Sequence, residues 1–161
     1  MALKRDEALQ PLSRQHHQGL MVSLFLSNGL KKGVATKPMR DFILQFWQDD
    51  LLKHFESEEQ VLVPIAKSYA ILEPLITRML LEHQQIVLII NRINNEARAE
   101  QLETIKAFAD QLEQHIRFEE RELFEQLQIA LSVEDMSLLQ SAFSEHTEKD
   151  FCMRYPAKFW E

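Results

Sequence analysis

His54-Phe-Glu-Ser-Glu58-Glu59 returns sixty-one residues later as His115-Ile-Arg-Phe-Glu119-Glu120. Residues four apart on an α-helix lie on one face, about one turn or ~6 Å along the axis. Each motif can therefore direct an imidazole nitrogen and a carboxylate oxygen at the same point. Two such helices that face each other offer two nitrogens and two carboxylates to a shared centre, which predicts a metal site in the core of a helix bundle.

Single histidine sites complete a pattern that occurs twice. The His16-His17 pair precedes the first motif, and His83 lies between the two motifs. Each half of the chain is therefore predicted as a helix that carries a histidine, followed by a helix that carries His-x-x-x-Glu-Glu. The two halves predict an approximate two-fold axis through the site. Together they offer four histidines and two glutamates to two metal ions, with two histidines for each ion and the glutamates as bridges.

Of the adjacent histidines, His16 is favoured as the ligand. On a helical wheel His16 falls near the centre of the apolar stripe, whereas His17 lies about 100° further round. His17 stays open as a substitute ligand or as a residue beside the ligands. The apolar stripe of this helix is formed by Leu9, Leu12, Leu20 and Leu24.

Apolar residues at three- and four-residue spacing run through most of the chain, which is the helical period. With 3 Gly and 5 Pro there are few helix breakers, so an all-α fold is predicted. Helices are expected over residues 6–31, about 38–67, 73–96, 99–130 and 133–149. Short connections make the first four antiparallel neighbours in an up-down four-helix bundle. Residues 1–150 are expected to form one domain, followed by an irregular, aromatic tail over residues 151–161.

Bulk composition excludes several classes of protein. A net charge of −7 without a Lys/Arg block argues against a nucleic-acid partner. The longest apolar run, residues 86–90, is far shorter than the ~20 residues that a membrane span needs. The N-terminus has no apolar signal-peptide core, and Cys152 is the only cysteine, so no intramolecular disulfide is possible. We expect a cytoplasmic protein without a membrane partner.

The residue types suit a metal site that stays open to ligands. Neutral imidazole and carboxylate together bind iron, manganese and zinc. Six protein ligands shared by two ions would leave positions for a small exogenous molecule. The competing interpretation is that such histidines and His-x-x-x-Glu pairs lie at the surface, as they usually do. Here both motifs sit among core-period neighbours, and a buried carboxylate without a partner is costly, so the pattern favours a cation.

Residues beside the motifs are interpreted more simply. Glu59 and Glu120 rotate away from the centre and are expected in solvent or in salt bridges. His146 is expected at the surface. Four aromatic residues are expected to pack in the core and to make the cavity around a bound metal apolar: Phe46, Trp47, Phe55 and Phe118.

The motifs resemble those of the hemerythrin-like, HHE cation-binding family. The resemblance rests on Leu12-Ser-Arg-Gln-His16-His17, Leu81-Glu82-His83 and the two His-x-x-x-Glu-Glu motifs, and it spans residues 12 to about 124. It implies a four-helix bundle around a non-heme, carboxylate-bridged di-iron centre, where zinc, manganese or nickel can replace iron. The metal ligands that it implies are His16, His54, Glu58, His83, His115 and Glu119.

Two positions depart from oxygen-carrying hemerythrins. Val87 stands where those proteins have a second histidine, four residues after His83. Glu119 follows His115 by four residues, whereas those proteins have an aspartate at five. The resulting set is closer to the hemerythrin-like domain of bacterial iron-sulfur-centre repair proteins. Those proteins usually carry a cysteine-containing N-terminal domain, which is not found in this sequence.

Three functions fit these residues. The first is a di-iron protein that binds, senses or handles O2, NO, peroxide or iron itself. The second is a peroxidase-like or NO-reducing enzyme. His17 is the only candidate for separate acid–base work, so a binding protein is expected more than an enzyme. The third is a metal-stapled interaction module without redox chemistry. In that case the helix over residues 133–149 and the aromatic tail dock a partner or a second copy in a homodimer; alternatively, the aromatic residues of the tail simply cover one end of the bundle.

Overall fold

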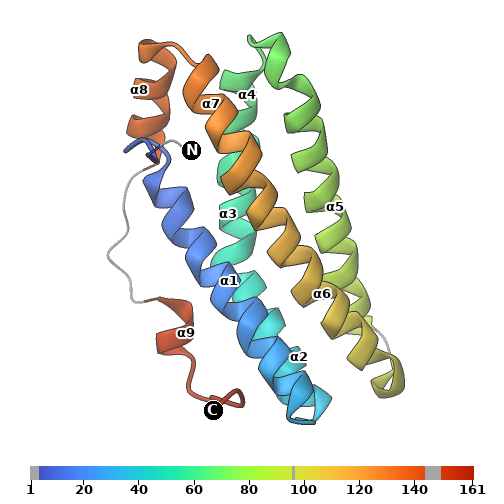
Figure 1. The fold of residues 1–161 in the computed structure, drawn as a ribbon. Helices are drawn as coiled ribbons and strands as arrows, with labels where there is room; N and C mark the ends of the chain where they lie inside the picture. The colour runs from blue at the N-terminus through green and yellow to red at the C-terminus, as the bar shows by residue number, and fades with distance from the viewer. Residues whose placement is uncertain (1–3, 96, 144–149) are drawn as a thin grey trace.

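The computed structural model describes residues 4–95, 97–143 and 150–161, and these residues form helices and connecting segments without a β-strand. Long helical stretches lie side by side and make a helical bundle (Figure 1). The all-α class predicted from the apolar spacing is confirmed. Within the described residues, no helix is both long and apolar enough to span a membrane.

The first long stretch is α1 (Gln10–Lys31), which begins later than the predicted start at residue 6. Asp6 instead starts a tight turn, where its carboxylate accepts a hydrogen bond from the Ala8 N–H at 2.9 Å. Pro11 then occupies the first helical turn, where its missing N–H removes no helical hydrogen bond. The helix ends before Gly33, whose φ of 70° lies in the left-handed region that favours glycine.

The inner face of α1 differs from the prediction at one leucine. Leu12 is buried and Leu20 is half-buried, but Leu24 is 56% exposed. These leucines are eight and four residues apart, and each four-residue step on an α-helix rotates a side chain by about 40°. Over several steps the series therefore leaves the core. Val22 and Leu26 are buried in its place.

Two of the other three long stretches, the second and the fourth, contain π-helical turns. The second comprises α2 (Thr36–Phe46), the π-helical η1 (Trp47–Leu51), α3 (Leu52–Ser57), the π-helical η2 (Glu58–Leu62) and α4 (Val63–Ala66). The third is α5 (Glu73–Asn95), which follows the short 3-10 helix η3 (Ala70–Leu72). The fourth comprises α6 (Arg98–Phe118), the π-helical η4 (Glu119–Leu123) and α7 (Phe124–Ala130). The predicted extents of these stretches are confirmed within a few residues.

Two of the π-helical turns occupy matching places in the repeated motifs. η2 begins at Glu58 and η4 begins at Glu119. Inward residues are spaced by four here, as in His115, Glu119, Leu123 and Leu127, and on a regular α-helix this series would rotate out of the core. A π turn closes its hydrogen bond five residues back and holds more residues per turn, which cancels the rotation. The ligand histidine, the glutamate and the core residues that follow therefore share one face.

The apolar core has two parts with polar side chains between them. On α1, for example, Leu12 belongs to one part and Val22 to the other, with His16 between them. α5 repeats this order with Met79, His83 and Ile86. The buried polar layer is therefore enclosed by packed apolar side chains along the bundle axis.

The C-terminal segments close the fold. Ser132 caps the start of α8 (Val133–Ala142), where its Oγ accepts a hydrogen bond from the Asp135 N–H at 3.1 Å. The helix ends before the predicted boundary at 149; residues 144–149, with His146, lie outside the described residues. The tail was predicted to be irregular, but it contains the short helix α9 (Phe151–Arg154).

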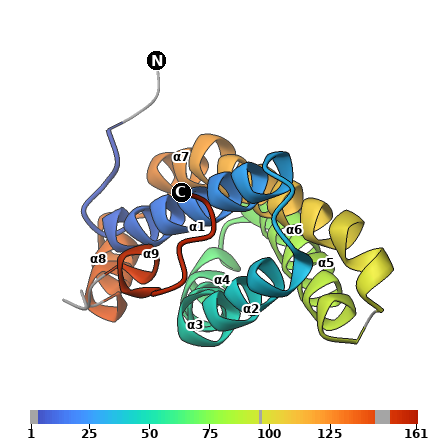
Figure 2. The same ribbon diagram turned by 90° about the horizontal axis from the view of Figure 1, so that it is seen from below.

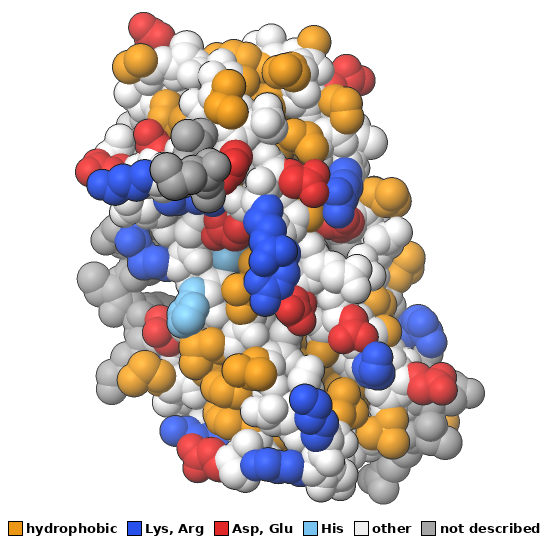
Figure 3. All heavy atoms as spheres, in the orientation of Figure 1, with side chains coloured by type: hydrophobic (Ala, Val, Ile, Leu, Met, Phe, Trp, Pro, Cys, Tyr) orange, Lys and Arg blue, Asp and Glu red, His pale blue; other side chains and the backbone are white. Residues whose placement is uncertain are grey.

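The aromatic tail packs on the bundle beside α1 (Figure 2). Phe151 and Trp160 are buried in the same part of the core as Phe42, and Trp160 stacks on Phe25 with ring centroids 4.3 Å apart. The tail therefore covers apolar surface of the bundle. Figure 3 shows one face of the molecule, where acidic and basic side chains are interspersed without a broad area of one charge.

Candidate metal centre

Six side chains meet in the buried polar layer, and they are the six that the motifs single out. All are at most 6% exposed, although each carries an ionisable group. They come from α1, α3, η2, α5, α6 and η4. We call them the His/Glu cluster: His16, His54, Glu58, His83, His115 and Glu119.

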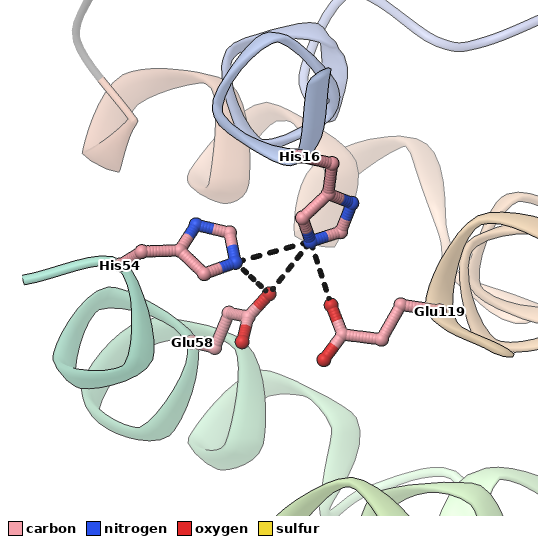
Figure 4. Close-up of side chains that lie close together, drawn as sticks. All are labelled: His16, His54, Glu58 and Glu119. Atoms are coloured by element: carbon pink, nitrogen blue, oxygen red, sulfur yellow. Dashed lines mark hydrogen bonds and ion pairs between the residues drawn. The ribbon is translucent and has the colours of Figure 1, made fainter. Parts of the chain in front are cut away.

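The two oxygens of Glu58 face different histidines. Oε1 lies 2.9 Å from His54 Nε2 and 3.6 Å from His16 Nε2. Oε2 lies 2.9 Å from His83 Nε2, on the other side of the carboxylate. Figure 4 shows the first group of contacts, with His16, His54 and both glutamates directed at one region. Glu58 is therefore shared between two pairs of histidines.

Glu119 repeats this arrangement from the opposite direction. Its Oε1 lies 2.7 Å from His115 Nε2 and 3.6 Å from His83 Nε2, while its Oε2 lies 3.0 Å from His16 Nε2. The cluster thus divides into two ligand sets that share both glutamates. The first set adds His16 and His54, the second adds His83 and His115, and within each set the ligand atoms lie within 4.8 Å of one another.

Each histidine is oriented by an oxygen on its outer side. A carboxylate or an amide oxygen only accepts, so the histidine nitrogen that contacts it, Nδ1, must donate and carry the hydrogen. The lone pair of a neutral imidazole is then on Nε2, which faces the centre. The four contacts are His16 with Glu120 at 3.2 Å, His54 with Gln15 at 2.6 Å, His83 with Glu59 at 2.8 Å and His115 with Glu82 at 2.9 Å.

The inward atoms of the cluster are consequently all acceptors when the histidines are neutral. Both oxygens of Glu58 and of Glu119 have no hydrogen-bond partner within the described part of the chain, and neither has Nε2 of His83 or of His115. Nε2 of His16 faces Nε2 of His54 at 3.0 Å. Buried acceptors that face one another are costly unless a cation lies among them. This donor set therefore fits a metal ion.

A comparison with protein families agrees with this geometry. A family model described as the hemerythrin HHE cation-binding domain matches residues 8–127. The chain belongs to this family. No curated protein and no solved structure matches the chain. The family match and the buried His/Glu cluster together indicate that this hemerythrin-like protein binds a metal cation.

The residues beside the ligands behave in part as predicted. Glu120 forms an ion pair with Arg5 at 3.0 Å and Glu59 is half-exposed, as expected for residues rotated off the centre. Each also accepts a hydrogen bond from a cluster histidine of another helix, which the helical wheel did not indicate. Gln15 and Glu82 play the same part and were not singled out. Their signal in the sequence is a matching register, because each immediately precedes a cluster histidine.

His17 lies apart from the cluster. The structure buries His16 among the ligands and leaves His17 exposed on α1. The sequence interpretation of His17 as a substitute ligand or an acid–base residue in the cavity is therefore wrong. Its exposure follows from the rotation of about 100° between neighbouring residues of a helix.

A cavity of about 570 Å³ reaches the cluster between α1 and the η1–α3 segment. His16, His54 and His115 form part of its wall. Gly19 also lines it, and a Cβ at this position would lie 2.5 Å from Ile116 Cδ1, so glycine permits the close approach of α1 to α6. The volume suits small ligands, which usually bind in cavities of ~300–1,000 Å³.

Without a cation, protons hold the cluster of this hemerythrin-like protein together. Burial would lower the pKa of His83, but Glu119 and Glu58 raise it to about 10. Burial would also lower the pKa of His115, but its neighbours, chiefly Glu119, raise this pKa to about 9. Burial and the charge of Glu119 would raise the pKa of Glu58, but His54 and His16 lower it to about 2. The metal-free site therefore holds histidinium–carboxylate pairs at neutral pH, and a metal must displace these protons.

The metal-free protein is expected to lose stability as the pH rises from 6.5 to 10. A histidine whose pKa is higher in the folded than in the unfolded state stabilises the fold fully below pH 6.5, and this contribution disappears as the pH passes about 9 to 10. Thermal unfolding of chelator-treated protein across this range would give a falling Tm. The double variant His83→Gln/His115→Gln is the control for lysines and tyrosines that also titrate there. An equal fall in both proteins would contradict the prediction.

Proposed function

We propose that the chain binds two iron ions in a non-heme dinuclear centre bridged by Glu58 and Glu119. We propose further that this centre binds or senses a small ligand such as O2, NO or peroxide. The division of each glutamate between two histidine pairs carries the proposal, since a single ion would leave one of the two ligand sets without a partner. Nitrogen and carboxylate ligands suit iron, although zinc, manganese or nickel fits the same donor set.

The histidines, their outer acceptors, the glutamates and the cavity would each have a role in such a centre. The histidines offer their Nε2 lone pairs, and the outer acceptors keep those lone pairs directed inward. The glutamates balance the charge of two cations. The cavity admits a small molecule to one side, where apolar side chains such as Phe46 and Phe55 line it together with charged ones such as Lys53. Iron, when bound, would supply reversible electron transfer and open positions for the ligand.

We also propose that the bundle has the up-down antiparallel topology expected for four helices joined by short connections. The long stretches that lie side by side in Figure 1 support this proposal. In this topology the two halves of the chain are related by an approximate two-fold axis, and each half brings one lone histidine and one His-x-x-x-Glu motif to the centre.

Iron loading of the reduced protein under anaerobic conditions tests the proposed function. We expect the iron content to approach two per chain, and we expect the absorption spectrum to change when O2, NO or peroxide is added. His16→Ala should reduce the iron content, whereas His17→Ala, a matched change one residue away on the exposed side of α1, should not. Retained iron without any spectral change would contradict ligand binding and favour the metal-stapled module. Sustained consumption of the added ligand would favour the enzyme.

A further inference from the structure

The two ligand sets have different surroundings, although the two halves of the chain match in register. The residue before each lone histidine accepts from the motif histidine of the same half: Gln15 in the first half and Glu82 in the second. The residue after each motif glutamate accepts from the lone histidine of the other half. Glu59 reaches His83, and Glu120 reaches His16. The only break in this symmetry is an amide at Gln15 where the other half has a carboxylate.

This break changes the charge around the first set. Glu120, behind His16, is paired with Arg5 at 3.0 Å, and Glu82, behind His115, is paired with Arg78 at 2.9 Å. One carboxylate balanced by arginine thus stands behind each set. Each set has one further outer acceptor. In the first set it is the neutral Gln15 behind His54, and in the second set it is the anionic Glu59 behind His83. A carboxylate that accepts the Nδ1 hydrogen makes an imidazole a stronger metal ligand than an amide does, so the second set is the stronger donor.

Access to solvent also differs between the sets. Both histidines of the first set, His16 and His54, line the cavity, and His54 is the most exposed member of the cluster. In the second set His83 is covered by the ring of Phe55, which stacks on it with centroids 3.8 Å apart. His115, the other histidine of the second set, also lines the cavity, so a molecule that enters can reach both histidines of the first set but only one of the second.

We propose that the two metal positions are unequal, with the position at His83 and His115 filled first and held tightly. The position at His16 and His54 is filled second and exchanges its ion more readily. Gln15 is the positioning residue that sets this difference. The inference rests on the proposed dinuclear site. Changes to such outer partners typically alter metal affinity ~10–100-fold, which gives the size of the expected difference.

Calorimetric titration of the metal-free protein with Fe²⁺ under anaerobic conditions tests the inference. The wild-type protein should bind in two steps whose affinities differ by about tenfold or more. His54→Ala should remove the weaker step and His115→Ala the tighter one. Glu82→Gln should weaken the tight step, whereas Gln15→Glu should tighten the weak step so that the two converge. Gln114→Glu is the matched control, because it makes the same change one residue before His115 but at an exposed position.

The outcomes separate this inference from the proposed function. Two equal steps in the wild-type protein, or a Gln15→Glu variant with unchanged steps, would overturn the inequality and leave the dinuclear site standing. Absence of any binding by a correctly folded wild-type protein would overturn both. Iron content after a brief chelator challenge gives a second readout: about one ion per chain should remain in the wild type, and it should be lost more readily from Glu82→Gln.

Discussion

Replacing Glu119 with alanine is expected to remove both metal ions from each chain, whereas replacing His54 removes at most one. Glu119 contacts His115 through one oxygen and His16 through the other, so its loss opens both ligand sets at once. It also removes one of the two negative charges that balance two cations in a buried site. His54 belongs to the first set alone. The metal content should therefore fall from about two ions per chain to near zero for Glu119→Ala.

Elemental analysis of anaerobically purified variants measures this difference. Glu119→Gln should behave like the alanine variant, because an amide of the same shape carries no charge and offers only one acceptor oxygen. The matched control is Glu122→Ala, which removes an exposed carboxylate from the same π-helical turn and should keep the wild-type content. Circular dichroism would verify that the variants remain helical. One retained ion in Glu119→Ala would show that the glutamates do not act as bridges.

The positions of the six cluster residues could be predicted because helical spacing and burial point to the same face. His54 and Glu58 are four apart, and so are His115 and Glu119, and each pair lies among apolar residues of the core period. A carboxylate in such a place needs a positive partner, which makes a chance arrangement costly. The choice of His16 over His17 follows from the same geometry.

The outer acceptors could not be predicted in the same way. Whether Glu59 reaches His83, or Glu82 reaches His115, depends on the distance and rotation between neighbouring helices. The spacing within one helix contains neither quantity. The doubled glutamates of the two motifs were visible, but a residue one position from a ligand is rotated by about 100° and is ordinarily solvated. Only the packed bundle brings these side chains back to a neighbouring helix.

The π-helical turns were missed for a related reason. The four-residue spacing from His115 to Leu127 was present in the sequence, and it departs slowly from the α-helical period. The same spacing on α1 has the opposite outcome, because α1 stays α-helical and Leu24 rotates into solvent. A helix can form a π turn that keeps such residues in the core, or it can stay α-helical and expose one of them. The packing of the neighbouring helices decides between the two. Similarly, Phe151 to Arg154 are too few residues to show a helical period, so α9 had no signal.

Replacing Phe42 with alanine is expected to reduce the free energy of unfolding by about 3–5 kcal/mol. The Phe42 side chain is fully buried, and its ring lies 4.9 Å from that of Tyr155 and 5.3 Å from those of Phe151 and Trp160. Truncation would remove these contacts and leave a cavity between α2 and the tail. Denaturant unfolding of the metal-free protein measures the effect, since a bound metal would add stability of its own. Leu88→Ala, at a leucine that is 62% exposed, is the control and should change stability by less than about 0.5 kcal/mol.

Measuring Phe42→Ala in a chain without the tail tests whether the tail contacts cause this loss of stability. Deleting residues 151–161 uncovers Phe42 on the tail side, so Phe42→Ala should cost much less in the shortened chain than in the full chain. The difference between the two costs is the coupling between Phe42 and the tail, and contacting residues typically couple by about 0.5–3 kcal/mol. Equal costs would mean that the tail does not pack over Phe42 in solution. The aromatic residues of the tail would then be free to dock a partner or a second copy of the chain.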